Sequence, residues 1–171
     1  EPENEGARRR IHRHHTAKQE AIITGVRAYN TNERLQVLYP KLMDYVKAGG
    51  NLVVQYNTNN RIGPVPPKIG PYPFTISRDR VTNEKATVKF INEKHPLLSS
   101  PNRISAADFE GWVQERGLYF ANKWDDRYET ILSCNDAGEP EKKGGMLLAR
   151  HGKGAFIYTG YAWFRQLPAR S

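Results

Sequence analysis

Residues 21–57 constrain the fold of this chain more than any other part of it, because they read as one complete β-α-β unit. The run at 21–25 is short, apolar and β-branched, which is typical of a strand buried on both faces. A helical pattern follows, and the two glycines at 49–50 predict its end. Residues 51–56 form a second apolar run. We predict that the two strands are neighbours in a parallel-majority sheet with helices on both faces.

The helical stretch between these strands has one apolar face. Leu35, Leu38, Leu42 and Val46 recur at intervals of three and four residues, as on one side of an α-helix. Pro40 interrupts the pattern. We therefore predict a short turn followed by a main helix that begins at Pro40, where the missing N–H costs little.

Proline dominates residues 58–80, where five prolines fall between positions 64 and 73. Such a segment fits neither a regular helix nor a central strand. A loop of this length within a compact domain is commonly functional. We expect an ordered loop that folds over the edge of the sheet.

Further along the chain the local signals are shorter. Residues 87–91 and 130–133 read as strands, and Ser105 with Asp108 three residues later reads as the start of a helix. Residues 145–160 contain two apolar runs around a glycine-bearing turn, which is typical of a β-hairpin.

Length and charge indicate one domain and a basic extension. A chain of 171 residues fits a single domain. The net charge of +8 arises from 26 basic and 18 acidic residues that are interleaved along most of the chain, and only positions 8–15 are densely basic. We expect residues 1–20 to be a flexible basic arm and residues 21–171 to be one α/β domain. No apolar run approaches the roughly 20 residues of a membrane helix, and we see no signal peptide.

Polar residues gather where the first two predicted strands end. In open α/β sheets, ligands bind outside the carboxyl ends of the strands. Guanidinium groups, planar amides, carboxylates and aromatic rings at such an edge are the groups that hold sugars. Our candidate binding residues are Arg27, Asn30, Gln55, Asn57, Arg78, Arg80, Trp112, Glu115 and Trp163.

Four of these candidates are expected to converge on one pocket: Arg27, Asn57, Arg78 and Trp112. Buried guanidinium groups need anionic partners, so we expect Asp79, Glu110 or Glu115 beside them. The alternative is that Glu115 and Arg116 make ordinary ion pairs, that the tryptophans fill the core and that the asparagines cap turns.

Catalytic patterns are weak. Cys134 is the single cysteine, and it has neither the flanking glycines of a nucleophile elbow nor a His-x-Glu pair after it. His95 precedes a proline, so we expect it to cap or pack at a loop. No histidine precedes the acidic pair Asp125 and Asp126, and we predict neither a metal site nor a cofactor.

Several longer segments together resemble one family, the class I glutamine amidotransferase-like domain found C-terminal to LmbE/PIG-L-type deacetylase modules in large bacterial proteins. They are residues 27–32, 49–57, 70–74, 108–112 and 158–168, and the resemblance covers roughly residues 21–168. It implies an α/β fold, a flavodoxin-like three-layer sandwich with the long proline-rich loop and the C-terminal hairpin. It also implies an extracytoplasmic, carbohydrate-related context.

The predicted function is that of a non-catalytic accessory domain of a PIG-L/LmbE-type protein, whose parent would be a zinc-dependent N-deacetylase. Its partners would be a carbohydrate ligand and the deacetylase module of the same parent chain. One alternative is a degenerate or reassigned hydrolase that uses Cys134 or Glu115. Another is a basic module that binds nucleic acid, which we expect less because the charges are scattered.

Overall fold

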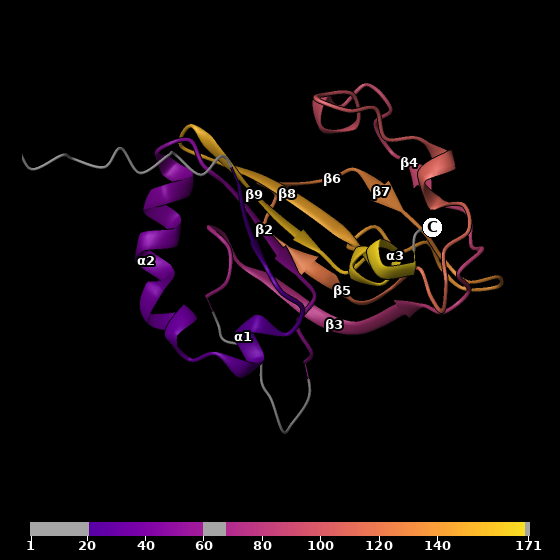
Figure 1. The fold of residues 1–171 in the computed structure, drawn as a ribbon, viewed down its shortest axis with the longest axis horizontal. Coiled ribbons are helices and arrows are strands. Elements are labelled where there is room, and N and C mark those ends of the chain that lie inside the picture. Colours follow the sequence, from indigo (N-terminus) through magenta and orange to yellow (C-terminus); the bar gives the residue numbers. More distant parts are fainter. Residues whose placement is uncertain (1–20, 60–67, 170–171) are drawn as a thin grey trace, which may run out of the picture.

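The structure is a computed structural model that describes residues 21–59 and 68–169. One five-stranded sheet crosses the domain, and two smaller two-stranded sheets lie beside it (Figure 1). The predicted basic arm at 1–20 and the centre of the proline-rich segment lie outside the described residues.

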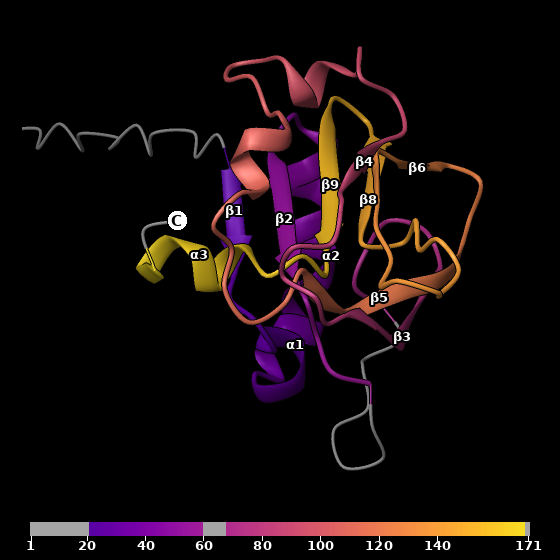
Figure 2. The same ribbon diagram turned by 90° about the vertical axis from the view of Figure 1, so that its right-hand side faces the viewer.

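The main sheet has the strand order β1-β2-β9-β8-β6, and Figure 2 shows β1, β2 and β9 side by side. Parallel pairing joins β1 to β2 and β2 to β9, which confirms the predicted neighbourhood of the first two strands. Antiparallel pairing joins β9 to β8 and β8 to β6. The strands are β1 (Ala21–Thr24), β2 (Asn51–Gln55), β6 (Tyr128–Thr130), β8 (Met146–His151) and β9 (Gly154–Thr159).

The predicted C-terminal hairpin is present as β8 and β9. Its register pairs Met146 with Thr159 and His151 with Gly154. All six residues of β9 are buried, as expected for the central strand of a sheet covered on both faces.

The long helix α2 (Arg34–Lys47) covers one face of the sheet. Its buried residues Met43 and Val46 share a core cluster with Leu52 of β2 and Phe156 of β9. This packing explains why the helix forms despite its internal proline.

Our prediction that the main helix begins at Pro40 is wrong. The helix begins at Arg34 and continues through Pro40, which is exposed. Proline removes one intrahelical hydrogen bond, and burial of the apolar face against β2 and β9 outweighs that loss. A separate short helix, α1 (Ala28–Thr31), precedes α2.

No long helix among the described residues covers the opposite face. Its core cluster joins Leu148 and Ile157 of the sheet to Leu98, Phe109 and Trp112. The last three lie in the segment between β3 and β5, which forms only the 3-10 helices η1 (Pro96–Leu98) and η2 (Ala106–Phe109). The capping box predicted at Ser105 is present, but it starts η2 rather than an α-helix.

The flavodoxin-like three-layer sandwich that the resemblance implied is therefore wrong for this chain. Parallel and antiparallel pairings are equal in number, two of each, so the sheet is mixed rather than parallel-majority. Within residues 21–59 and 68–169 a long helix covers one face only, and prolines and glycines break the segment that covers the other face into loops and short turns. The short helix α3 (Trp163–Ala169) follows β9.

The expected loop at 58–80 is also wrong in its second half. Residues 74–81 form β3 (Phe74–Val81), which pairs with β5 (Gly117–Trp124) in an irregular antiparallel ribbon. The strands predicted at 87–91 and 130–133 are shorter than expected. They contribute β4 (Lys89–Phe90) and β7 (Leu132–Ser133), which pair with each other.

Candidate functional site

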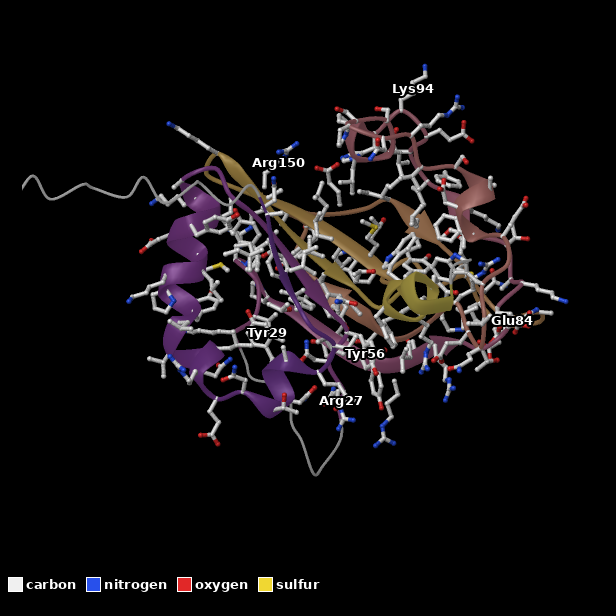
Figure 3. All side chains as sticks on the ribbon, in the orientation of Figure 1. Arg27, Tyr29, Tyr56, Glu84, Lys94 and Arg150 are labelled. Atoms are coloured by element: carbon white, nitrogen blue, oxygen red, sulfur yellow. The ribbon has the colours of Figure 1, made fainter. Side chains whose placement is uncertain are left out.

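The carboxyl ends of the parallel strands β1, β2 and β9 carry a compact group of rings and charges. We call Arg27, Tyr56, Glu115, Tyr119 and Arg165 the edge cluster. At its centre, the ring of Tyr56 stacks on Tyr119 with centroids 5.6 Å apart and an interplanar angle of 14°. Figure 3 shows Arg27 and Tyr56 at the same end of the sheet.

The surroundings of Tyr56 act on its pKa in opposite directions. Burial raises the pKa of Tyr56, whereas the positive charges of Arg165 and Arg27 oppose that shift. The carboxylate of Glu115 and the ring of Tyr119 add to the rise. Tyr56 is only 8% exposed, and two arginines and one carboxylate act electrostatically on its phenol.

Glu115 is the anion of the edge cluster. It is a buried side chain, and its Oε1 lies 3.0 Å from Nη2 of Arg165. Its Oε2 lies 3.6 Å from Nη2 of Arg80, whose side chain is largely exposed. We expected Asp79, Glu110 or Glu115 beside Arg27 and Arg78, whereas Glu115 pairs with Arg80 and Arg165 instead. The Nε atom of Arg165 is buried and has no acceptor among the described residues.

Backbone strain gathers at the same place. Three non-glycine residues in the described part of the chain have positive φ: Arg27 (59°), Gln114 (71°) and Tyr119 (57°). The N–H of Arg27 donates to the carbonyl of Tyr56 at 2.8 Å, and the side-chain oxygen of Gln114 accepts from Arg165. Residues held in sparsely populated backbone regions concentrate at functional sites.

The three predicted amide residues serve mainly to hold the edge together. Asn30 and Thr58 exchange two hydrogen bonds, of 2.9 and 2.8 Å. Gln55 donates to the carbonyl of Thr24 at 3.3 Å. The side chain of Asn57, which is fully buried, accepts from the N–H of Tyr29 at 2.9 Å and donates to the carbonyl of Gln55.

Of the other predicted residues, Arg78 lies on the surface, whereas Trp112 and Trp163 pack against each other. Arg78 is exposed on β3. Trp112 is buried, donates to the carbonyl of Asp108 at 2.8 Å and meets Trp163 edge-on at 4.9 Å. The indole N–H of Trp163 donates to Oγ1 of Thr159, the last residue of β9.

We find no contact that joins Arg27, Asn57, Arg78 and Trp112 within residues 21–59 and 68–169. Tyr56, Tyr119, Gln114 and Arg165 were missed. Tyr56 could have been found, because it follows a strand directly. The other three come from segments distant in sequence and carry no local signal.

Cys134 is poorly suited to nucleophilic catalysis. It is fully buried in the core, and burial raises its pKa to about 11. A thiol needs to be a thiolate to attack, so this environment disfavours the Cys134 hydrolase. Among the residues described, no group of three or more His, Cys, Asp or Glu side chains is arranged to hold a metal ion.

His95 has the capping role that we expected. Its Nδ1 accepts from the N–H of Leu97 at 3.1 Å at the start of η1. Asp125 pairs with Arg127 in a turn. No helix in the described ranges is long and apolar enough to cross a membrane.

Comparisons with known proteins return distant structural similarity only. No family model and no curated protein matches the chain. A β-galactosidase from Rahnella sp. R3 shares 17% identity over 83% of this chain and 20% of its own length, with a TM-score of 0.45. Gan42B, a GH42 β-galactosidase from G. stearothermophilus, shares 14% identity over 88% of this chain and 21% of its own, with a TM-score of 0.49.

The cytoplasmic protein STM3548 from Salmonella typhimurium shares 15% identity over 82% of this chain and 59% of its own, with a TM-score of 0.47. The chain spans about a fifth of the length of the β-galactosidases. All of these TM-scores are low, so the similarities define neither the fold nor the function.

Proposed function

We propose that this chain is a non-catalytic binding domain that holds a carbohydrate at the edge cluster. The carrying observation is the convergence of the strained residues Arg27, Gln114 and Tyr119 on Tyr56, beside the ion pair of Glu115. Rings, guanidinium groups and a carboxylate in one place are suited to a hydroxyl-rich ligand. Our proposal includes the role of an accessory domain in an LmbE/PIG-L-type deacetylase protein.

Two features favour binding over catalysis at this edge. Both oxygens of Glu115 are engaged by arginines, which leaves the carboxylate poorly placed to act as a general base. The Nε–H of Arg165 is a buried donor without an acceptor among the described residues. A buried unsatisfied donor is costly, and a ligand hydroxyl would satisfy it.

The test is a titration of the isotope-labelled chain with soluble oligosaccharides, followed by amide NMR. We use two probes, a neutral glucose hexamer and an N-acetylglucosamine hexamer. We expect at least one of them to shift the amide resonances of Tyr56, Tyr119 and Arg165 in a saturable manner. If neither probe shifts these resonances, the carbohydrate proposal fails.

Tyr119→Asn is the sharpest variant for this site. Asparagine tolerates a positive φ, so the variant removes the ring that stacks on Tyr56 while keeping the backbone. We expect affinity to fall about fivefold, because a stacked ring contributes about 1 kcal/mol. Tyr72→Asn is the matched control: its hydroxyl bonds to the carbonyl of Arg150, which lies at the opposite end of the sheet (Figure 3).

The nucleic-acid alternative predicts a different result. The affinity of binding through phosphate contacts falls steeply as the salt concentration rises, whereas the affinity for a neutral oligosaccharide depends little on salt. Repeating the titration with a single-stranded oligonucleotide at two salt concentrations separates the two functions.

A further inference from the structure

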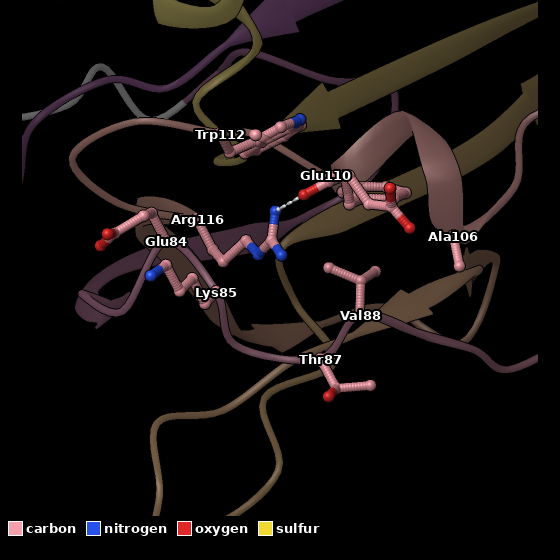
Figure 4. Close-up of a pocket in the computed structure, with 10 residues that line it drawn as sticks. Glu84, Lys85, Thr87, Val88, Ala106, Glu110, Trp112 and Arg116 are labelled. Atoms are coloured by element: carbon pink, nitrogen blue, oxygen red, sulfur yellow. Dashed lines mark hydrogen bonds between the residues drawn. The ribbon is translucent and has the colours of Figure 1, made fainter. Parts of the chain in front are cut away.

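A second candidate site is a cavity of about 360 Å³ beside Arg116, the residue that precedes β5 (Figure 4). We call it the Trp112 cavity. Its apolar walls come from Val88, Ala106, Phe109 and Trp112, and its charged groups from Glu84, Lys85, Glu110 and Arg116. This volume lies within the range of small-molecule sites.

Arg116 supplies a buried cation to this cavity. The residue is 5% exposed. Its Nε donates to the carbonyl of Ala86 at 2.8 Å, and its Nη1 donates to the carbonyl of Phe109. A guanidinium has five N–H groups, so three remain without an acceptor in the described part of the chain.

The charge of Arg116 has aromatic neighbours rather than an anionic partner. Its Cζ atom lies 5.2 Å from the ring centroid of Trp112 and 5.8 Å from that of Phe109. No carboxylate among the described residues lies within 4.0 Å of it. In Figure 4, Glu84 and Lys85 point away from the guanidinium. A buried cation of this kind is costly unless an anion joins it.

The acids at the cavity limit which anion can enter. Glu84 contributes a negative field at Arg116, and Glu110 lies at the exposed side of the cavity. Together they disfavour a dianion such as phosphate and leave room for a single negative charge. The flat rings of Phe109 and Trp112, with the aliphatic side chain of Val88, favour a compact body with an apolar face.

We propose that the Trp112 cavity binds a small ring-shaped monocarboxylate, whose carboxylate pairs with Arg116 and whose ring packs against Val88, Phe109 and Trp112. Guanidinium and carboxylate match as a planar, bidentate pair. This site is separate from the edge cluster and does not depend on carbohydrate binding there. Two sources share this chemistry, a sugar acid and an aromatic acid.

The experiment titrates the labelled chain with sodium glucuronate and sodium benzoate at constant ionic strength. Glucuronamide and benzamide are the uncharged controls. The reporters are the indole N–H of Trp112 and the side-chain Nε–H of Arg116, observed by NMR. We expect saturable shifts of both signals with at least one acid, and affinity at least tenfold weaker for its amide.

Ala106→Phe tests the place of binding without removing Arg116. Ala106 is exposed and lines the cavity, so a phenyl ring there blocks the site at small cost to the fold. Ala107→Phe is the matched control, because Ala107 is the next exposed residue of the same 3-10 helix and does not line the cavity. We expect Ala106→Phe to reduce affinity at least tenfold and Ala107→Phe to leave it within twofold.

A shift with glucuronate alone supports the sugar acid, a shift with benzoate alone supports the aromatic acid, and a shift with both supports the shared class. The proposal is overturned if neither acid shifts the two reporters. It is also overturned if the amides bind as well as the acids, or if Ala106→Phe binds as tightly as the unsubstituted chain.

Discussion

Glu115 and Arg116 are neighbours in the chain, yet they belong to two regions with opposite electrostatics. Both are nearly fully buried. Glu115 enters the edge cluster, where Arg80 and Arg165 neutralise it. Arg116 enters the Trp112 cavity, where its partners are carbonyl groups and aromatic faces. Glu115 has cationic partners among the described residues, whereas Arg116 has no carboxylate within 4.0 Å.

The difference teaches that burial alone does not distinguish a structural charge from one that awaits a ligand. In a buried ion pair, each charge is compensated by the other side chain. Removing one partner leaves the other charge buried and uncompensated, which lowers the free energy of unfolding. A cation held only by backbone carbonyls keeps its full charge in a low-dielectric setting. The cavity of Arg116 is therefore a candidate site for an anion.

The largest expected effect comes from Arg116→Ala. It removes two hydrogen bonds from a charged donor and the packing against Trp112, so we expect the free energy of unfolding to fall by about 3 kcal/mol. Glu115→Ala should cost less, about 1 kcal/mol, because its partners are partly exposed. Urea unfolding measures both, with the exposed Arg150→Ala as control. Equal costs for Arg116 and Arg150 would erase the distinction between the two regions.

A second comparison separates charge from strain at Arg27. Arg27→Ala removes the guanidinium and keeps a side chain at φ 59°, whereas Arg27→Gly removes the strain as well. We expect the glycine variant to be more stable than the alanine variant by about 1 kcal/mol. Both should bind carbohydrate more weakly than the unsubstituted chain. Thermal unfolding and the oligosaccharide titration provide the measurements, and an alanine variant that matches the glycine variant would argue against stored strain.

Cys134 leaves the charge of Arg116 uncompensated at neutral pH, because burial keeps its thiol protonated. Burial raises its folded pKa from 9.0 to about 11. Because the folded pKa is raised, the buried neutral thiol contributes its full stabilisation below pH 9. This stabilisation is lost as pH rises toward 11. The destabilisation caused by Cys134→Ala should therefore be smaller at pH 10 than at pH 8, by about 1 kcal/mol. Urea unfolding of both chains at both pH values checks this. If Cys134→Ala destabilises the chain equally at pH 8 and pH 10, the folded pKa of Cys134 lies near its ordinary value.

The smallest effect is expected at Arg80. Its guanidinium lies 3.6 Å from Glu115 and its side chain is 60% exposed, so solvent screens the pair. We expect Arg80→Ala to change the free energy of unfolding by at most about 0.5 kcal/mol, and this change to vanish in 0.5 M salt, on the order of magnitude known for surface pairs. Arg165→Ala, at 3.0 Å from the same carboxylate, should cost more. A larger effect at Arg80 would show that Glu115 depends on both arginines equally.

Part of the candidate site could be predicted from the sequence, because strand ends are local features. The runs at 21–25 and 51–56 predicted Arg27 and Asn57 at the same edge of the sheet. In the structure the two strands are paired, and the N–H of Arg27 donates to the carbonyl of Tyr56. Arg165 and Tyr119 could not be assigned to it. They reach Tyr56 only because α3 and β5 fold back across the sheet, and no periodicity encodes such long-range contacts.

The sequence by itself determined the β-α-β unit and the C-terminal hairpin, since apolar periodicity and glycine turns act over a few residues. Only the tertiary structure decided what covers the second face of the sheet. There, loops and 3-10 turns replace the expected helices, and they enclose the Trp112 cavity. It also decided that Glu115 and Arg116 face different regions. Both residues lie in the irregular segment just before β5, and the surroundings of each come from distant segments of the chain.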